Sequence, residues 1–124
     1  MKEIHEMEVY RLAERLSDMV WNTYDSWDFK AQKTMGIQII RSSDSIAANI
    51  AEGYGRYHFQ ENIQFCRISR GSMYETQDHL ITCLDNEYIA QEEYKSIWDI
   101  SENAIRVLDG YIRYLKKQQR GELR

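Results

Sequence analysis

The sequence predicts an all-α fold, an antiparallel up-down-up-down four-helix bundle, on three observations. The 124 residues include no proline and only six glycines, so little in the chain interrupts long helices. Apolar residues recur at spacings of three and four along four segments, which is the period of one helix face. The connections between these segments are short, and short connections make neighbouring helices antiparallel. A chain of this length is expected to form a single domain, residues 1–124, whose core needs no disulfide.

The first helix is predicted over residues 8–26. Val9 and Leu12 begin its apolar stripe, and its opposite face is charged, which is typical of a helix on the surface of a bundle. The second helix is predicted over residues 29–52. Asp28 stands directly before it, at a position where its carboxylate can cap the helix N-terminus.

Gly53 and Gly55 are predicted to end the second helix, because glycine readily takes the left-handed conformation found at helix C-termini. The third helix is predicted over residues 58–86 and the fourth over residues 91–119, both with apolar residues at the helical period. Gly71 lies in the middle of the third helix, where a glycine costs about 1 kcal/mol relative to alanine. We therefore expect another helix to approach closely at this glycine.

Polar and charged side chains stand where a helical protein would ordinarily place its apolar stripe. A projection of residues 38–52 at about 100° per residue puts five of them within one narrow arc. In the third helix Arg70 interrupts the apolar positions, so its guanidinium needs partners or a wet channel. We name the whole set the polar seam; its members are Gln38, Arg41, Ser45, Asn49, Glu52, Arg56, Arg70, Ser72 and Glu75.

Three interpretations of the polar seam fit the sequence. In the first it is a buried network of hydrogen bonds and ion pairs that fixes the register between helices or subunits, with Glu52 or Glu75 beside Arg70. In the second it lines a lumen or cleft that receives a charged ligand. In the third, arginines interleaved with aromatic residues hold phosphates and stack bases of a nucleic acid. The residues for this third interpretation are Tyr54, Arg56, Tyr57, Arg67, Arg70 and Tyr74.

The net charge and the spacing of the histidines and serines indicate which kinds of activity the chain could have. The formal net charge of −4 argues against a monomer that grips nucleic acid by bulk electrostatics, although a ring of subunits would multiply a local basic patch. His5, His58 and His79 show no metal-ligand spacing, and neither Ser45 nor Ser72 has a histidine at a catalytic spacing. The sequence therefore predicts no metal, no cofactor and no catalysis.

The two cysteines and the apolar segments bear on location. Cys66 and Cys83 lie on one predicted helix, roughly 25 Å apart at about 1.5 Å of rise per residue, which is beyond disulfide reach. Both are interpreted as buried thiols in a reducing compartment. No segment reaches the roughly 20 apolar residues of a membrane span, and the first residues lack the apolar core of a signal peptide. These features predict a cytoplasmic protein that contacts no membrane.

Two motifs in these helices resemble those of a known family, the four helix bundle proteins, also named 23S rRNA-intervening sequence proteins. The first, S-I-x-x-N-I-A-E-G-x-x-R, is matched by residues 45–56, with Gln38 and Arg41 ahead of it. The second, A-R-G-S-x-x-E, is matched in its R-G-S-x-x-E part by residues 70–75. The resemblance covers about residues 9–115, and two motifs at the expected separation make it specific.

What the resemblance implies is a bacterial protein that forms a homopentameric ring of antiparallel bundles, with the polar seam at subunit boundaries or in a central channel. Members of the family are encoded within insertions in 23S ribosomal RNA genes. A structurally similar protein, the accessory variability determinant of diversity-generating retroelements, binds nucleic acid and a reverse transcriptase. The expected function is that of a non-catalytic homo-oligomeric scaffold or adaptor. The alternative is an accessory protein that binds RNA or DNA in association with a reverse transcriptase.

Overall fold

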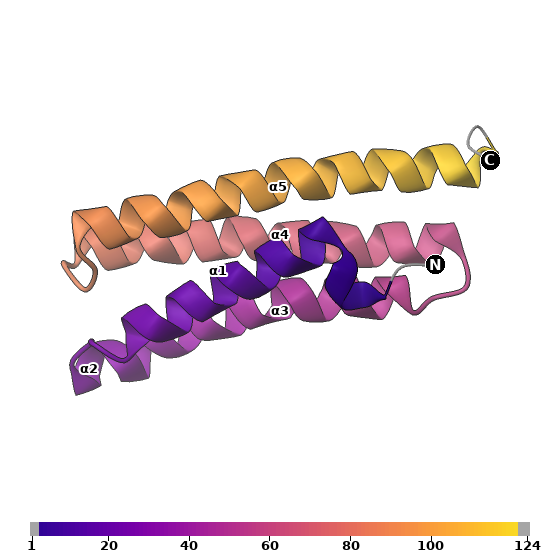
Figure 1. The fold of residues 1–124 in the computed structure, drawn as a ribbon. Coiled ribbons are helices and arrows are strands. Elements are labelled where there is room, and N and C mark those ends of the chain that lie inside the picture. Colours follow the sequence, from indigo (N-terminus) through magenta and orange to yellow (C-terminus); the bar gives the residue numbers. More distant parts are fainter. Residues whose placement is uncertain (1–2, 122–124) are drawn as a thin grey trace.

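The computed structural model describes residues 3–121, and these form a bundle of four long helices without any strand (Figure 1). The long helices are α1 (Glu8–Tyr24), α3 (Ile37–Tyr54), α4 (Phe59–Asp85) and α5 (Gln91–Gln119). Short segments precede them: a 3-10 helix over Ile4–Glu6, helix α2 over Phe29–Ala31 and a π-helix over Gln32–Gly36. The predicted all-α class is confirmed for this part of the chain. The two ends of the predicted domain, residues 1–2 and 122–124, lie outside the described residues.

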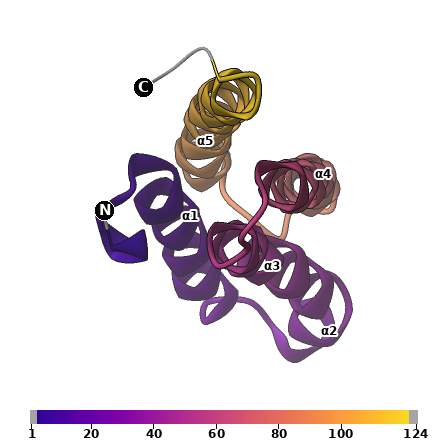
Figure 2. The same ribbon diagram turned by 90° about the vertical axis from the view of Figure 1, so that its right-hand side faces the viewer.

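Each long helix packs against two others. Helix α3 contacts α1 and α4, and α5 contacts the same two helices from the other side, so that α1 lies diagonally opposite α4 (Figure 2). Apolar side chains of all four helices fill the space between them, among them Leu16, Ile46, Met73 and Leu108. Figure 1 shows the α4–α5 connection at the α2 end of the bundle and the α3–α4 connection at the opposite end. Within residues 3–121, no helix combines the length and the apolar run needed to cross a bilayer.

Helix α1 ends at Tyr24, slightly before the predicted end at Ser26. The hydroxyl of Ser26 donates to the carbonyl oxygen of Thr23 at 2.8 Å, which helps to turn the chain out of the helix. The predicted cap of the next helix is confirmed, because the backbone N–H of Ala31 donates to Oδ1 of Asp28 at 2.8 Å. These local bonds fix the corner between α1 and α2.

The second predicted helix is unbroken from α2 to α3, but it widens over Gln32–Gly36 into a π-helix. This wide turn lies against the ring of Tyr24: a Cβ atom on Gly36 would stand 2.6 Å from Cε2 of that ring. Nε2 of Gln32 also donates to the carbonyl oxygen of Tyr24 at 3.0 Å. Apolar spacing did not reveal the π-helix, because that spacing assumes the constant period of an α-helix.

The helix ends beside the predicted glycines, with Gly55 directly after its last residue, but the predicted left-handed conformation is wrong. The helix continues to Tyr54, and Gly55 is right-handed, with a φ of −78°. Gly53 is buried, and a Cβ atom there would lie 2.6 Å from Oδ1 of Asn62 and 2.9 Å from Cβ of Phe65. Glycine is therefore needed at this position so that the start of α4 can approach the end of α3.

The prediction of a close helix at Gly71 is also wrong within the described chain. Gly71 is exposed, and a Cβ atom added to it would meet no heavy atom within 4 Å. Its position within α4 turns it away from both neighbouring helices, so the close contact inferred for Gly71 occurs at Gly53 instead.

The two cysteines are free and buried, as predicted. Burial raises the pKa of the Cys66 thiol to about 12 and that of the Cys83 thiol to about 11. Because the nucleophile is the thiolate, thiols held neutral in this way are unreactive at neutral pH.

Candidate functional site

Most of the polar seam follows the outer groove between α3 and α4. Its members are exposed or half-buried in the single chain, so the structure does not bury its charged members between α3 and α4. The reason is that α3 turns Ile39, Ile46 and Ile50 toward the core, so the neighbouring polar arc points past α4 to the solvent. The exposed members are Gln38, Arg41, Glu52, Arg56 and Glu75, and the half-buried ones are Ser45, Asn49, Arg70 and Ser72.

A shallow hollow of about 380 Å³ lies in this groove, and we name it the α3–α4 hollow. Nε2 of His79 stands 4.0 Å from Oε2 of Glu75, one helical turn away. Arg41 has no hydrogen-bond or ion-pair partner among residues 3–121. The hollow thus offers an unpaired guanidinium beside a carboxylate and an imidazole. Its lining residues are Gln38, Arg41, Ser42, Ser45, Glu75 and His79.

Small hydroxyl side chains form the floor of the groove. The Oγ atoms of Ser45 and Ser72 are 2.7 Å apart, and Oγ1 of Thr76 is 2.8 Å from Oγ of Ser42. The hydroxyl of Ser69 donates to a backbone carbonyl oxygen of α3 at 2.8 Å. These bonds join α3 to α4 at close range, and each hydroxyl satisfies a polar group that would otherwise be costly to bury.

Sequence reasoning did not single out Ser42, Ser69 or Thr76, and it did not place His79 in the polar seam. A signal was present, because Ser69, Ser72 and Thr76 follow one another at spacings of three and four, the period of one helix face. It was missed because the apolar residues Cys66 and Met73 were used to predict the side of this helix that packs against its neighbours.

At the far end of the groove one arginine is paired with two carboxylates. Nη2 of Arg56 is 3.5 Å from Oε2 of Glu52, its Nη1 is 3.8 Å from Oε2 of Glu61, and its guanidinium lies 4.9 Å from the centre of the Phe65 ring. The side-chain amide of Asn49 donates to a carbonyl oxygen one turn earlier in its own helix, at 2.8 Å. This end of the groove is therefore internally satisfied, unlike the α3–α4 hollow.

Arg70 lies apart from the rest of the polar seam, on the side of α4 that faces α5. Its Nη1 donates to Oδ1 of Asp109 at 2.7 Å, and the two side chains are 37% and 36% exposed. The prediction of Glu52 or Glu75 as its partner is wrong. Two turns further along the same face of α4, Nε2 of Gln77 donates to the hydroxyl oxygen of Ser101 in α5 at 2.9 Å. This face of α4 therefore contacts α5 through polar side chains.

The arginines and aromatic residues expected for nucleic acid do not all share one surface, although Arg67, Arg70 and Tyr74 follow one face of α4 at spacings of three and four. Arg56 and Arg70 are both held in ion pairs. Tyr54 lines a cleft between α1 and α5, whereas Tyr57 is 92% exposed on the α3–α4 connection. Pairing of the cations lowers what they can contribute to phosphate binding, which depends on free Lys and Arg.

The chemistry that the groove offers is binding through hydrogen bonds and charge. The hydroxyls of Ser45 and Ser72 bond to each other and not to a histidine. In the part of the chain from residue 3 to residue 121, no three His, Cys, Asp or Glu side chains come together as a metal site would require. The pair of Glu75 and His79 holds two such groups.

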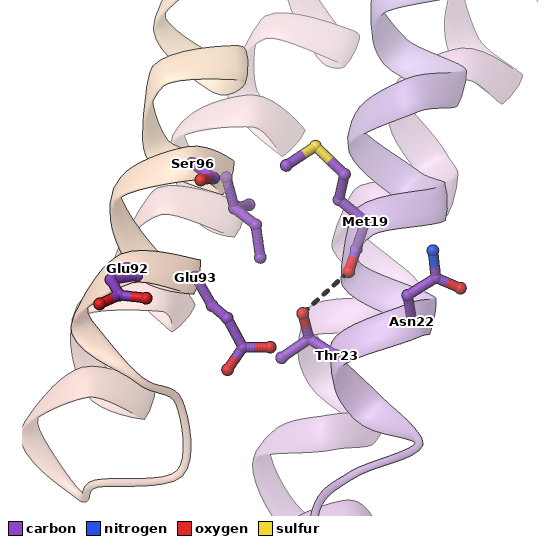
Figure 3. A pocket seen from close by; sticks show the side chains of 7 residues that line it. Met19, Asn22, Thr23, Glu92, Glu93 and Ser96 are labelled. Atoms are coloured by element: carbon purple, nitrogen blue, oxygen red, sulfur yellow. Dashed lines mark hydrogen bonds between the residues drawn. The ribbon is translucent and has the colours of Figure 1, made fainter.

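Two further hollows lie between α1 and α5. The smaller, of about 310 Å³, is drawn in Figure 3, where Glu93 of α5 extends toward α1 and the hydroxyl of Thr23 donates to the carbonyl oxygen of Met19 at 3.0 Å. The larger, of about 620 Å³, lies beside the start of α1 and is mostly apolar. The structure thus separates a groove with an unpaired cation from a pair of hollows that contain carboxylates.

Comparison with known proteins gives a family match, matches among solved structures and one negative result. The family model described as 23S rRNA-intervening sequence protein matches residues 5–110. Among solved structures, the chain is similar to a protein of unknown function from the S23 ribosomal protein family of Bacteroides thetaiotaomicron, with 29% sequence identity and a TM-score of 0.77. That alignment covers 84% of this chain and 97% of the other. No curated protein matches the sequence.

Proposed function

This chain belongs to the 23S rRNA-intervening sequence protein family, and from that membership we propose that it is a non-catalytic scaffold or adaptor that acts as a homo-oligomer. The proposed assembly is a homopentameric ring of antiparallel up-down-up-down bundles, joined through the α3–α4 hollow. The solved relative is described as a protein of unknown function. The support for the proposal therefore comes from the surface of this chain.

The observation that carries the proposal is the unpaired guanidinium of Arg41 in the α3–α4 hollow. Ile37 precedes Arg41 by four residues and Ile68 precedes Ser72 by four, so each isoleucine shares a helix face with a residue of the groove. The two isoleucines are 39% and 53% exposed. Apolar side chains beside an arginine are typical of the central part of a protein interface.

An acidic side chain of a second copy is the partner that this surface lacks. The isolated bundle already pairs Arg56 and Arg70, which leaves Arg41 as the seam's arginine with an open position. A carboxylate brought to it by another subunit would form a charge-assisted hydrogen bond and would also fix the register of the contact. A scaffold role follows from such an assembly, because every subunit then presents the same remaining surface to other molecules.

The test is the mass of the purified protein by size exclusion with multi-angle light scattering, with absorbance recorded at 260 and 280 nm. The wild type is expected to elute at five times the chain mass of 14.9 kDa, free of nucleic acid. Arg41→Glu is expected to shift the peak to the monomer, because it places like charges opposite each other. Arg67→Glu is the matched control: it makes the same charge change at an exposed position of α4 outside the hollow and should keep the wild-type mass.

Three results would overturn parts of this proposal. A monomeric wild type would exclude the homo-oligomeric scaffold. Equal masses for the Arg41→Glu and Arg67→Glu variants would exclude the α3–α4 hollow as the contact. A peak with excess absorbance at 260 nm that high salt removes would replace the scaffold by the alternative, an accessory protein for RNA or DNA that works with a partner such as a reverse transcriptase, because phosphate contacts weaken steeply with ionic strength.

A further inference from the structure

We propose that the larger cleft between α1 and α5 binds an organic cation, an ammonium group carried on an apolar chain. The cleft has a volume of about 620 Å³ and lies beside the first turn of α1. Its described lining consists of three tyrosines, three aliphatic or thioether side chains and one carboxylate, that of Glu8. Apart from Tyr54 at the end of α3, the lining lies on other elements than the α3–α4 hollow, and the inference does not depend on the proposed function.

Three aromatic rings supply the attraction for a cation. The rings of Tyr111 and Tyr114 lie nearly parallel, at 14°, with centroids 6.3 Å apart, and Tyr54 contributes the third ring. A cation within about 6 Å of such a ring is attracted by the negative face of its π system. Three rings around one cleft therefore favour an ammonium group over a neutral group of the same shape.

Hydrogen bonds outside the cleft hold two of these rings in place. Nδ2 of Asn62 donates to the hydroxyl oxygen of Tyr111 at 3.2 Å, and Nε2 of Gln118 donates to that of Tyr114 at 3.0 Å. In both bonds the tyrosine oxygen accepts, so the bonds restrict the orientation of the two rings. A ring that is fixed before binding loses little conformational entropy when the ligand arrives.

The charge of the cleft is complementary to a cation. Glu8 is exposed and has no ion-pair partner among residues 3–121, and no described residue of the lining is cationic. The hollow at the other end of α1 also contains carboxylates, those of Glu92 and Glu93, and no cation among its described lining residues (Figure 3). The groove between α1 and α5 is thus acidic at both hollows, and the formal net charge of −4 acts in the same direction.

The aliphatic walls of the cleft determine which group the ligand carries beside its cationic head. Val9 and Val107 face the cleft from opposite helices, and Met7 lies beside them. Burial of an aliphatic chain against such walls contributes about 0.8 kcal/mol for each CH₂ group removed from water. A ligand with a cationic head and a short alkyl chain therefore matches the aromatic and the aliphatic parts of the cleft together.

Three probes with one hexyl chain separate charge from apolar contact. Hexyltrimethylammonium is the cation, hexyldimethylamine N-oxide is the neutral probe at pH 7.5, and hexanesulfonate is the anion. Isothermal titration calorimetry of the full chain, in its native assembly, is expected to give affinities in the order cation, neutral, anion, with at least about a tenfold difference between the first and the last. The affinity for the cation is expected to fall as salt is raised.

Variants locate the binding. Glu8→Gln is expected to lower the affinity for the cation by about three- to fivefold and to leave the affinity for the neutral probe unchanged. Tyr114→Leu keeps an apolar wall but removes the aromatic ring, and it is expected to lower the affinity for the cation by about fivefold. Tyr74→Leu is the control, because Tyr74 is exposed on α4 and lies outside the cleft. Equal affinity for the three probes, a preference for the anion, or equal losses in the Tyr114→Leu and Tyr74→Leu variants would each overturn the inference, whatever mass light scattering gives for the protein.

Discussion

At the scale of the residue, Arg70 shows how a neighbour decides what a charged side chain does. Its place among the apolar positions of α4 predicted a buried cation, and the structure instead places it on a half-exposed contact with Asp109 of α5. Water reaches both side chains, since each is somewhat more than one-third exposed, and it screens their attraction. The pair therefore orients α4 against α5 more than it stabilises the fold.

Arg70→Ala is accordingly expected to lower the free energy of unfolding by no more than about 1 kcal/mol. Urea denaturation of Arg70→Ala, Asp109→Asn and the double variant measures the coupling between the two side chains in a double-mutant cycle. Their coupling should shrink in high salt. A loss of several kcal/mol in the single variant would mean that the arginine is buried more deeply, in the assembly, than the isolated bundle shows.

Gly53 and Gly71 make a matched pair of glycines in helices. An alanine Cβ at Gly53 would stand 2.6 Å from Asn62 and 2.9 Å from Phe65, so Gly53→Ala is expected to destabilise the protein by about 1–3 kcal/mol through overpacking. Gly71→Ala meets no atom within 4 Å and is expected to stabilise it by about 0.5–1 kcal/mol, because alanine is the better helix former. Thermal unfolding followed by circular dichroism measures both, and the opposite order of melting temperatures would contradict the packing described for Gly53.

At the scale of the element, the contact between α3 and α4 is built from small hydroxyl residues where most bundles use larger apolar ones. Ser42, Ser69 and Thr76 are buried, and their hydroxyls bond within α3, within α4 or between the two. Small side chains let the two helix backbones approach, and the hydrogen bonds keep the contact satisfied. The groove outside this contact is shallow for the same reason.

Ser69 provides the test of this contact, since it is fully buried and bonds to the backbone of α3. Ser69→Ala removes one hydrogen bond and is expected to cost about 0.5–1.5 kcal/mol. Ser69→Leu forces the helices apart and is expected to cost more, about 1–3 kcal/mol or above. Urea midpoints of the two variants give the comparison. If leucine were tolerated as well as alanine, the close approach of α3 and α4 would not depend on small residues.

The π-helix over Gln32–Gly36 is the second feature that belongs to this scale. It lets the chain pass beneath the ring of Tyr24 while α2 and α3 remain one continuous helix. The extra residue of such a turn shifts the helix register, so the apolar positions before and after it follow different phases. This is why the regular spacing used to predict the helix described each half and missed the turn between them.

At the scale of the whole molecule, the α3–α4 hollow and the hollows between α1 and α5 differ in charge. The α3–α4 hollow holds Arg41 together with Glu75 and His79, whereas the hollows between α1 and α5 hold the carboxylates Glu8, Glu92 and Glu93 without a cation among their described lining residues. Unlike surfaces on one bundle favour heterologous contacts, in which one face of a subunit meets a different face of the next subunit. Such contacts can close into a ring. The carboxylates between α1 and α5 are also part of the reason for proposing that the larger cleft binds a cation.

The buried ionisable groups predict how the stability of the molecule depends on pH. Burial raises the pKa of Cys66 from 9.0 to about 12, that of Cys83 from 9.0 to about 11 and that of Tyr111 from 10.0 to about 12. The folded state keeps these protons at pH values where the unfolded chain has lost them. Stability is therefore fully present below about pH 9 and falls as the pH rises from there toward the raised values.

Urea midpoints at pH 7, 9 and 10.5 are expected to fall in that order, slightly between the first two values, because both thiols are already about half ionised in the unfolded chain at pH 9, and more steeply to the third. Each group that ionises only in the unfolded chain contributes a slope of up to about 1.4 kcal/mol per pH unit. Cys66→Ala is expected to be less stable at pH 7, because it leaves a cavity, but to show a shallower decline above pH 9. A decline as steep as that of the wild type would exclude Cys66 from the alkaline effect.

Much of the fold followed from local regularities in the chain. Apolar spacing predicted the four long helices, because the helical period is a property of each segment alone, and Asp28 was recognisable as a cap because a cap needs only the residues that follow it. The two motifs in residues 45–56 and 70–75 indicated the family that the comparison then gave. The position of the free cysteines within the core also followed from their spacing on one helix.

Only the tertiary structure decided which surface each polar residue reached. A helix projection gives the angle between side chains but not the direction of the neighbouring helix, so it could not tell that Arg41 would face an open hollow and Arg70 would face Asp109. The roles of Gly53 and Gly71 were exchanged for the same reason, since space around a glycine is set by other elements. Local periodicity thus determined the helices, and their packing determined the sites, because a site is a relation between side chains that the sequence holds far apart.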